Sequence, residues 1–362
     1  MAAPLVVYYV TDHGYGHATR AAAVAAALER RGARVALRTG VPAWLFADEG
    51  VAASVTAVDF DAGLVMKDAL TVDIPASLLL HETLLARWDR DLETETAALR
   101  TLKPDAVISD AGALPLEAAR RAGAPAVLAG NFAWDWIMEP WAAVDPRWEA
   151  VRRRQAQAYA AAELFLRMPL GGDGPSCRAA EDVPLVTRRP RMGRDAVRAL
   201  IGVSPAETRP LVAFSLGGVP WESDGMTVHD LDGLLFVAYA ARPAGLHAEW
   251  IQLPSHARVR HCDILAAADL ALTKPGYGTF SELLMSKTPA LVVERSDFRE
   301  CVPLMENMRR LGRVRSLPRA EFEAGRWAEP LRELRAASDP WRELDASGDE
   351  AVAGRVLSLV PA

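Results

Sequence analysis

Short apolar runs alternate with longer amphipathic stretches along this chain. In the first part of the chain, the pattern predicts strands at 5–10, 34–39, 54–59, 105–109 and 125–129. Between them it predicts helices at 18–31, 82–100 and 115–122. Continuous apolar runs are typical of strands that are covered on both faces, and strands that alternate with helices form parallel sheets. The pattern therefore predicts an α/β protein.

The series of strands begins again after a polar segment. Residues 182–192 contain two prolines and three arginines, which is typical of a linker. After it, strands are predicted at 211–216, 234–238, 249–253, 269–273 and 290–294. We therefore expect two α/β domains, at 1–181 and 193–347, with a cleft between them. Ligands of such sheets bind at the carboxyl ends of the strands.

Composition supports two domains and excludes several classes of protein. At ~150 residues per domain, 362 residues correspond to two domains. No apolar run reaches the ~18 residues of a membrane helix, and the start of the chain lacks the basic residues of a signal peptide. The three cysteines are too scattered for a disulfide framework or a zinc site, so a cytoplasmic location is expected. A net charge of −6 argues against nucleic acid as a partner.

The stretch from Lys274 to Glu282 joins a predicted strand to a helix expected to begin near Ser281. Gly276 and Gly278 lack a Cβ atom, so an anion can approach the backbone closely. The first turn of a helix offers unpaired N–H groups and a partial positive charge, which suit a phosphate. The alternative is an ordinary turn that binds nothing.

Ser215, Gly217 and Gly218 form a second glycine turn at a strand end. It gives the same domain two amide-rich loops, which can line one crevice. Glu282 follows Thr279 by three residues, as in a helix capping box. Alternatively, the Glu282 carboxylate has a functional role and accepts hydrogen bonds from ribose hydroxyls.

An early turn from Gly14 to Thr19 approaches the dinucleotide-binding fingerprint, but Thr19 replaces its third glycine. The second strand also ends without an acidic residue for the ribose, so a nicotinamide cofactor is disfavoured. His17 lies at a helix start, where the helix dipole favours its neutral, basic form. It is either a catalytic base or a structural residue. Arg20, one turn later, either contacts an anion or is solvated.

Aromatic and polar residues gather directly after the strand at 125–129. Asn131 and Asp135 can bond sugar hydroxyls, and Trp134 can stack on a sugar ring. Because they follow a strand's carboxyl end, we expect them to face the cleft and bind an acceptor. The alternative is that the tryptophans fill the core or an interface.

Taken together, these motifs resemble those of GT-B glycosyltransferases, such as the peptidoglycan N-acetylglucosaminyltransferase and the plant galactolipid synthases. A closer resemblance is to the N-terminal, glycosyltransferase-like region of plant L-arabinokinases. It covers nearly the whole chain, through the patterns at 8–20, 68–73, 131–136, 182–189 and 274–282. No kinase-type phosphate loop is visible in the sequence.

The resemblance implies two Rossmann-like domains, with a final helix within 348–362 that packs back on the first. It implies transfer from a nucleotide-diphosphate sugar, expected to be uridine-based, with inversion and with His17 as general base. The expected donor-binding residues are Gly16, Arg20, Ser215, Gly217, Gly218, Lys274, Gly276, Tyr277, Gly278, Thr279 and Glu282. No cofactor beyond this co-substrate is expected, and no metal, because no Asp-x-Asp pair adjoins a glycine turn.

Two other functions stay open. The turn from Gly16 to Arg20 also resembles the Gly-His-x-x-Arg turn of nucleotide-sugar hydrolases with this fold, in which water takes the place of the acceptor. The chain can also be a binding module that holds a nucleotide sugar without turning it over. The sequence names neither the sugar nor the acceptor.

Overall fold

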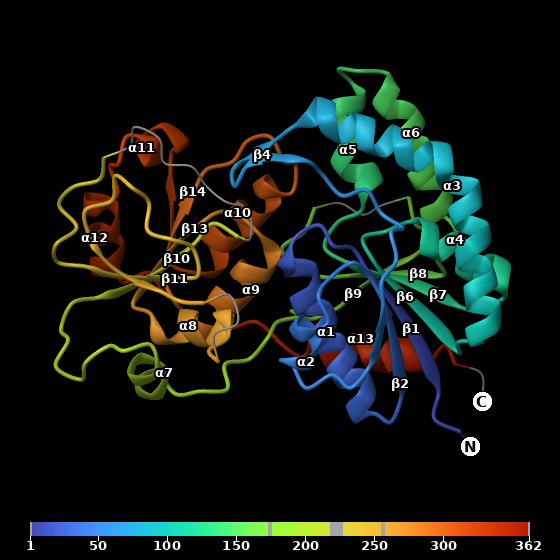
Figure 1. The fold of residues 1–362 in the computed structure, drawn as a ribbon, viewed down its shortest axis with the longest axis horizontal. Coiled ribbons are helices and arrows are strands. Elements are labelled where there is room, and N and C mark those ends of the chain that lie inside the picture. Colours follow the sequence, from blue (N-terminus) through green and yellow to red (C-terminus); the bar gives the residue numbers. More distant parts are fainter. Residues whose placement is uncertain (1, 173–175, 218–226, 255–257, 361–362) are drawn as a thin grey trace.

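The computed structural model describes residues 2–172, 176–217, 227–254 and 258–360. Two sheets lie in the two halves of the molecule (Figure 1). The strands of the first sheet are β1 (Leu5–Val10), β2 (Arg34–Arg38), β3 (Ser54–Thr56), β6 (Ala106–Asp110), β7 (Ala126–Gly130), β8 (Leu164–Arg167) and β9 (Ala180–Asp182). Those of the second are β10 (Leu211–Ser215), β11 (Leu235–Ala238), β12 (Glu249–Gln252), β13 (Leu270–Thr273), β14 (Ala290–Val293) and β15 (Val314–Leu317).

Both sheets are parallel and doubly wound, which confirms the predicted fold class. Their strand orders are β3-β2-β1-β6-β7-β8-β9 and β12-β11-β10-β13-β14-β15. In each sheet the chain first builds outward on one side and then crosses to the other side. The switch points lie between β1 and β6 and between β10 and β13, and in open α/β sheets ligands bind at the carboxyl ends of such strands.

Helices cover both faces of each sheet. Those up to the second sheet are α1 (Tyr15–Arg30), α2 (Trp44–Ala47), α3 (Ile74–Leu102), α4 (Leu114–Ala122), α5 (Trp134–Ala142), α6 (Arg147–Tyr159) and α7 (Arg194–Leu200). The later ones are α8 (His261–Ala267), α9 (Tyr277–Ser286), α10 (Cys301–Leu311), α11 (Arg319–Glu323), α12 (Ala328–Ala336) and α13 (Gly348–Leu357). Alternate residues of β1 point into opposite cores: Tyr8 packs with α1 residues and Tyr9 with α3 residues. Every β1 residue after Leu5 is buried, which explains the unbroken apolar run.

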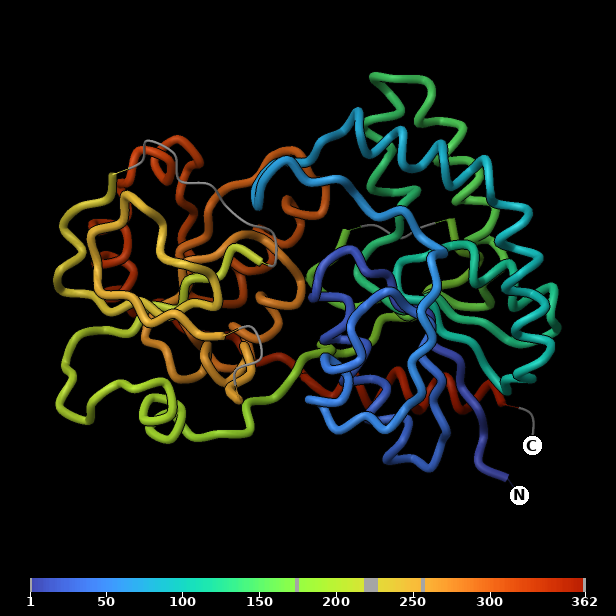
Figure 2. Tube along the Cα trace, viewed as in Figure 1, coloured from blue at the N-terminus to red at the C-terminus, as the bar shows by residue number. Residues whose placement is uncertain are grey.

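The chain passes between the two halves twice, at neighbouring places. The Leu185 N–H donates to Asp345 O at 2.8 Å, and the Gly348 N–H donates to Leu185 O at 3.2 Å. Beyond this point α13 packs against α1, so the last helix lies under the first half (Figure 2). Within the described residues, no helix is both long and apolar enough to cross a membrane.

Two predicted helix starts differ from the structure. The first helix begins at Tyr15 and α9 begins at Tyr277, each about one turn before the predicted start. Glycine weakens a helix interior, so the pattern predicts that each helix begins after its glycine turn. In the structure Gly16 and Gly278 lie inside the first helical turns. A short hairpin of β4 (Met66–Asp68) and β5 (Thr71–Val72), which the pattern did not predict, reaches from the first half toward the second.

Candidate active site

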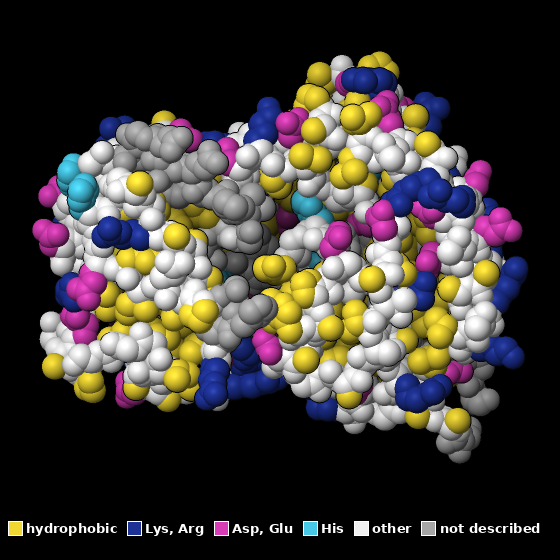
Figure 3. Space-filling view, in the orientation of Figure 1, with side chains coloured by type: hydrophobic (Ala, Val, Ile, Leu, Met, Phe, Trp, Pro, Cys, Tyr) yellow, Lys and Arg dark blue, Asp and Glu magenta, His cyan; other side chains and the backbone are white. Residues whose placement is uncertain are grey.

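The glycine turns of the two halves meet at the switch points. A Cβ atom added to Gly278 would lie 3.0 Å from the Gly16 Cα atom, so the start of α9 touches the start of α1 through two glycines. Gly217 follows β10 with φ +86° and lies beside the Lys274 side chain. The predicted Gly218 lies outside the described residues. Figure 3 shows that this face of the molecule is hollowed between the halves.

His17 is paired with a carboxylate that the sequence analysis did not single out. Its Nδ1 atom lies 2.7 Å from Asp110 Oδ1. Asp110 is the last residue of β6, and the parallel register places it opposite Val10, just before the turn that carries His17. Asp110 directly follows the strand predicted at 105–109, and an acidic residue in that position was the signal that could have identified it. Nδ1 also lies 2.9 Å from Arg20 Nη2, which can only donate, but its shorter contact is with the carboxylate. Paired with this carboxylate, the imidazole carries its proton on Nδ1, which leaves Nε2 free to accept a proton. No residue in the described part of the chain bonds Nε2.

Arg20 shares the same carboxylate. Its Nε and Nη2 atoms each donate to Asp110 at 2.6 Å, and its guanidinium lies 5.2 Å from the centre of the Tyr277 ring. Burial alone would raise the pKa of Asp110, but Arg20 and His17 hold it below its usual value. Asp110 is therefore ionised between two donors. Since Arg20 is 3% exposed and fully paired, it holds the site together from within and is not poised to bind an anion directly.

The network continues across the boundary between the halves. Arg20 Nη1 donates to Asn131 Oδ1 at 2.5 Å, and Asn131 Nδ2 donates to Glu300 Oε1 at 2.6 Å. Glu300 directly precedes α10 of the second half, and burial raises the pKa of its carboxyl group. An unbroken chain of hydrogen bonds therefore links His17 to Glu300, which the sequence analysis missed because no local motif marks it.

His13 lies beside His17, with their ring centres 6.5 Å apart. The Leu64 N–H donates to His13 Nδ1 at 3.1 Å, which places the proton of the neutral ring on Nε2. Burial, followed by the charge of His17, lowers the pKa of His13 to about 3. His13 is therefore a neutral donor, in contrast to the carboxylate-paired His17.

Glu282 is bonded to the linker and to the second half, and it does not cap α9. Its Oε1 accepts from Arg188 Nε at 2.7 Å, and its Oε2 lies 2.6 Å from His261 Nδ1. His261 Nε2 in turn lies 2.9 Å from the Ser215 hydroxyl, so these residues form one cluster. Burial alone would raise the pKa of Glu282, but Arg188 and His261 lower it. An ionised carboxylate has about four lone-pair sites, and the contacts with Arg188 and His261 occupy only part of them.

The remaining predicted donor residues line the start of α9. Gly276 precedes the helix, and Tyr277, Gly278 and Thr279 form its first turn, with no side chain capping the N–H groups. The Tyr277 hydroxyl bonds the Val186 backbone of the linker at 3.2 Å. The first-turn amides can therefore serve an anion.

Lys274 is a partly buried cation near this turn. Its Nζ donates to Ala69 O at 2.6 Å, and none of the described carboxylates forms an ion pair with it. Burial, followed by the nearby charge of Arg295, lowers the pKa of Lys274 to about 8. An anionic ligand would compensate this charge.

The expectation that Trp134 and Asp135 face the cleft is wrong. Trp134 is 0% exposed, and its Nε1 donates to Asp61 Oδ2 at 2.9 Å. Asp135 is 4% exposed and accepts from the backbone N–H of Trp136 and of Ser176, both at 2.9 Å. Both residues lie in the first turn of α5, and their side chains are buried in the core. Asn131, by contrast, bonds Glu300 of the second half.

These two doubly wound sheets, with glycine turns that meet at their switch points, define the GT-B fold of glycosyltransferases. The fold matches that of the kitacinnamycin glycotransferase, with a TM-score of 0.62 and 19% identity over 100% of both chains. It also matches that of a UDP-glucosyltransferase from Polygonum tinctorium, with a TM-score of 0.60 and 11% identity over 99% of both chains.

In sequence, the chain is 34% identical to L-arabinokinase of Arabidopsis thaliana over 357 residues. This similarity confirms the resemblance inferred from the motifs. It covers 97% of this chain, which spans about a third (34%) of the relative's length. No family model matches the chain.

Proposed function

We propose that this protein is a glycosyltransferase that moves a sugar from a nucleotide-diphosphate donor, with UDP as the nucleotide, onto a hydroxyl acceptor. The observation that carries the proposal is the His17–Asp110 pair, which lies at the switch point of the first sheet. The start of α9 meets the same turn through Gly16 and Gly278. A base in one half thus faces an anion-binding helix start in the other. The name of the Polygonum tinctorium enzyme supports UDP as the nucleotide.

The transfer is a single displacement. His17 Nε2 takes the proton of the acceptor hydroxyl as that oxygen bonds to the anomeric carbon of the sugar. The bond from this carbon to the diphosphate oxygen breaks, and its electron pair leaves with the diphosphate. Asp110 stabilises the imidazolium that forms. Because attack comes from the side opposite the leaving group, the configuration at the anomeric carbon inverts.

The second half stabilises the leaving diphosphate. The N–H groups of Gly278 and Thr279 lie in the positive first turn of α9, where fixed dipoles lower the energy of developing negative charge. Lys274 adds a cation that is desolvated and therefore acts strongly. Glu282 accepts a hydrogen bond from a ribose hydroxyl. No metal is part of the proposed step.

Hydrolysis of the donor is the second candidate. The burial of Trp134 and Asp135 removes the acceptor contacts expected from the sequence, and a water molecule needs none of them. We assign no kinase step, although the Arabidopsis relative is named for one, because the similarity covers only a third of that protein.

The experiment is incubation of the protein with a panel of UDP-sugars, with and without hydroxyl acceptors, followed by analysis of the products. Transfer predicts a glycoside of inverted anomeric configuration that forms only with an acceptor, and His17→Ala should abolish it. Free sugar in the absence of an acceptor supports hydrolysis. If no donor turns over but UDP-sugars bind equally to wild type and His17→Ala, the chain is a binding module and the proposal fails.

A further inference from the structure

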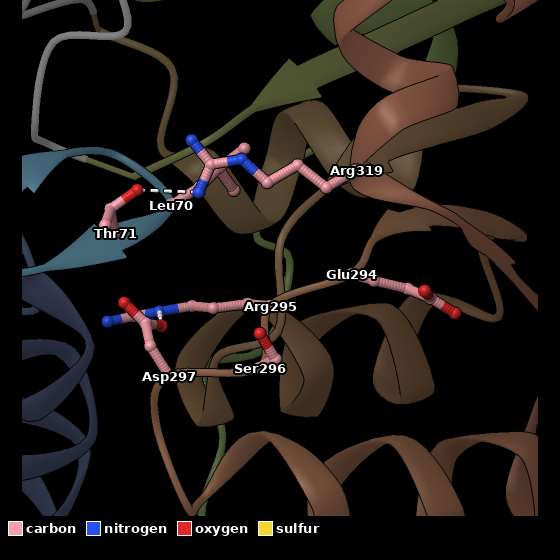
Figure 4. A pocket seen from close by; sticks show the side chains of 7 residues that line it. All are labelled: Leu70, Thr71, Glu294, Arg295, Ser296, Asp297 and Arg319. Atoms are coloured by element: carbon pink, nitrogen blue, oxygen red, sulfur yellow. Dashed lines mark hydrogen bonds and ion pairs between the residues drawn. The ribbon is translucent and has the colours of Figure 1, made fainter.

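A pocket of about 260 Å³ lies apart from the His17 centre, between the β4–β5 hairpin and the carboxyl ends of β14 and β15 (Figure 4). It is lined by Leu70, Thr71, Glu294, Arg295, Ser296, Asp297 and Arg319. The sequence analysis singled out the segment 68–73 without giving it a role. The structure makes that segment one wall of this pocket.

Contacts from both halves hold the walls in place. Arg319 Nη1 donates to the Thr71 hydroxyl at 2.6 Å, and the Val72 N–H donates to Asp297 Oδ2. Next to these residues, the Lys274 ammonium donates to Ala69 O. The hairpin is therefore fixed against the second sheet before any ligand binds, and such preorganisation lowers the entropic cost of binding.

The charges of the lining balance one another. Both arginines of the lining are paired with carboxylates. Arg319 lies 3.3 Å from Asp68 Oδ2 and 2.7 Å from Glu323 Oε1. Arg295 Nε donates to Asp297 Oδ1 at 3.0 Å, so this pair is internally neutralised. A phosphate would meet two carboxylates as well as two cations. The described residues contain no group of three or more metal-ligating side chains here or elsewhere. The balance favours an uncharged ligand.

The donors and acceptors of the lining suit hydroxyl groups. Guanidinium groups donate from a planar fork, carboxylates accept, and the hydroxyls of Ser296 and Thr71 do both. The Ser296 hydroxyl bonds none of the described residues, and Ser296 lines the pocket beside Arg295 (Figure 4). Ligand pockets for drug-sized molecules begin at about 300 Å³, so the volume fits one small ring.

We propose that this pocket is a sugar-binding subsite that takes a single uncharged monosaccharide ring. The ring is either the sugar of the donor or that of a separate acceptor. Its place in a transfer reaction rests on the function proposed above, but its binding chemistry does not. Lys274 connects the pocket wall to the donor turn, because it contacts Ala69 on one side and Gly217 on the other.

The test is saturation-transfer NMR of the full chain with D-glucose, D-galactose, D-xylose and L-arabinose as separate probes. At least one probe should bind the wild type. Ser296→Ala should weaken this binding by about 3–10-fold, the effect of one lost hydrogen bond. Ser296→Leu should abolish it by filling the space. The matched controls Ser338→Ala and Ser338→Leu, at an exposed serine of the second half outside the pocket, should change nothing.

The two sources of the ring are separated by repeating the titration with saturating UDP-glucose. Competition assigns the pocket to the donor's sugar, and undiminished binding assigns it to a separate sugar. The proposal is overturned if no probe binds the wild type, or if Ser296→Leu binds a probe as well as the wild type does. A UDP titration on the same samples keeps the two proposals apart. If UDP binds and no sugar does, only the subsite fails, and if sugars bind and UDP does not, only the transferase assignment fails.

Discussion

Replacing Asp110 by asparagine removes the charge that both His17 and Arg20 depend on. Asp110 is 0% exposed and accepts three hydrogen bonds of 2.6–2.7 Å from these two side chains. Asp110→Asn keeps the shape but leaves the buried Arg20 guanidinium without its counter-charge. Breaking a buried pair by neutralising one partner costs ~3–5 kcal/mol, so the variant should unfold at clearly lower urea concentration.

The same substitution should slow the reaction for a separate reason. The amide NH₂ group donates where the carboxylate accepts, so it favours the His17 tautomer with the proton on Nε2, which cannot act as a base. We expect donor turnover, measured as UDP release, to fall by ~10²–10⁴-fold per folded molecule.

His17→Ala is the matched control, because it leaves the Arg20–Asp110 pair intact. It should lose as much turnover as Asp110→Asn at a stability cost of only about 1–3 kcal/mol, that of one hydrogen bond to a charged group. If Asp110→Asn turns over the donor nearly as fast as wild type while His17→Ala is inactive, Asp110 does not orient the base and the reasoning is refuted.

Three further predictions concern other parts of the site. Trp134→Ala should cost ~3–5 kcal/mol in urea unfolding and leave turnover per folded molecule unchanged, whereas slower turnover with unchanged stability would restore the acceptor role. Because the pKa of Lys274 falls from 10.5 to about 8 on folding, the unfolded chain binds more protons between these values. The unfolding free energy should therefore rise with pH across this window, and Lys274→Met should remove the rise. Glu282→Gln should lower the melting temperature, since Arg188 loses its closest carboxylate, and an unshifted melting curve would contradict this.

Local patterns predicted the strands and the glycine turns because both depend on near neighbours in sequence. A strand that is buried on both faces has an unbroken apolar run in its sequence. The close approach of the turns at Gly16 and Gly278 requires residues without a Cβ atom. Asp110 and Glu300 could not be predicted in the same way. Asp110 reaches His17 only through the pairing of β1 with β6, and Glu300 reaches Asn131 only once the two halves are packed together.

The error at Trp134 has a different cause. A residue that follows a strand lies near the cleft in position, but its side chain can point either way. The start of α5 at Trp134 turns the indole toward Asp61 and the core. Local sequence carries no signal for this direction, which is set by the angle at which the helix packs. Arg20 is likewise predicted from the sequence as a donor-binding residue, but its role as an internal bridge depends on two distant partners, Asp110 and Asn131.

Calorimetric titration of UDP into the wild-type chain, with the melting temperature followed in parallel, tests the central claim most directly. The account predicts one site per chain and a rise in melting temperature, since a ligand at 100 times its dissociation constant adds about 2.7 kcal/mol of stability. UMP, which lacks the second phosphate, should bind more weakly because it loses contacts with the start of α9. No heat and no shift in melting with UDP would contradict the account.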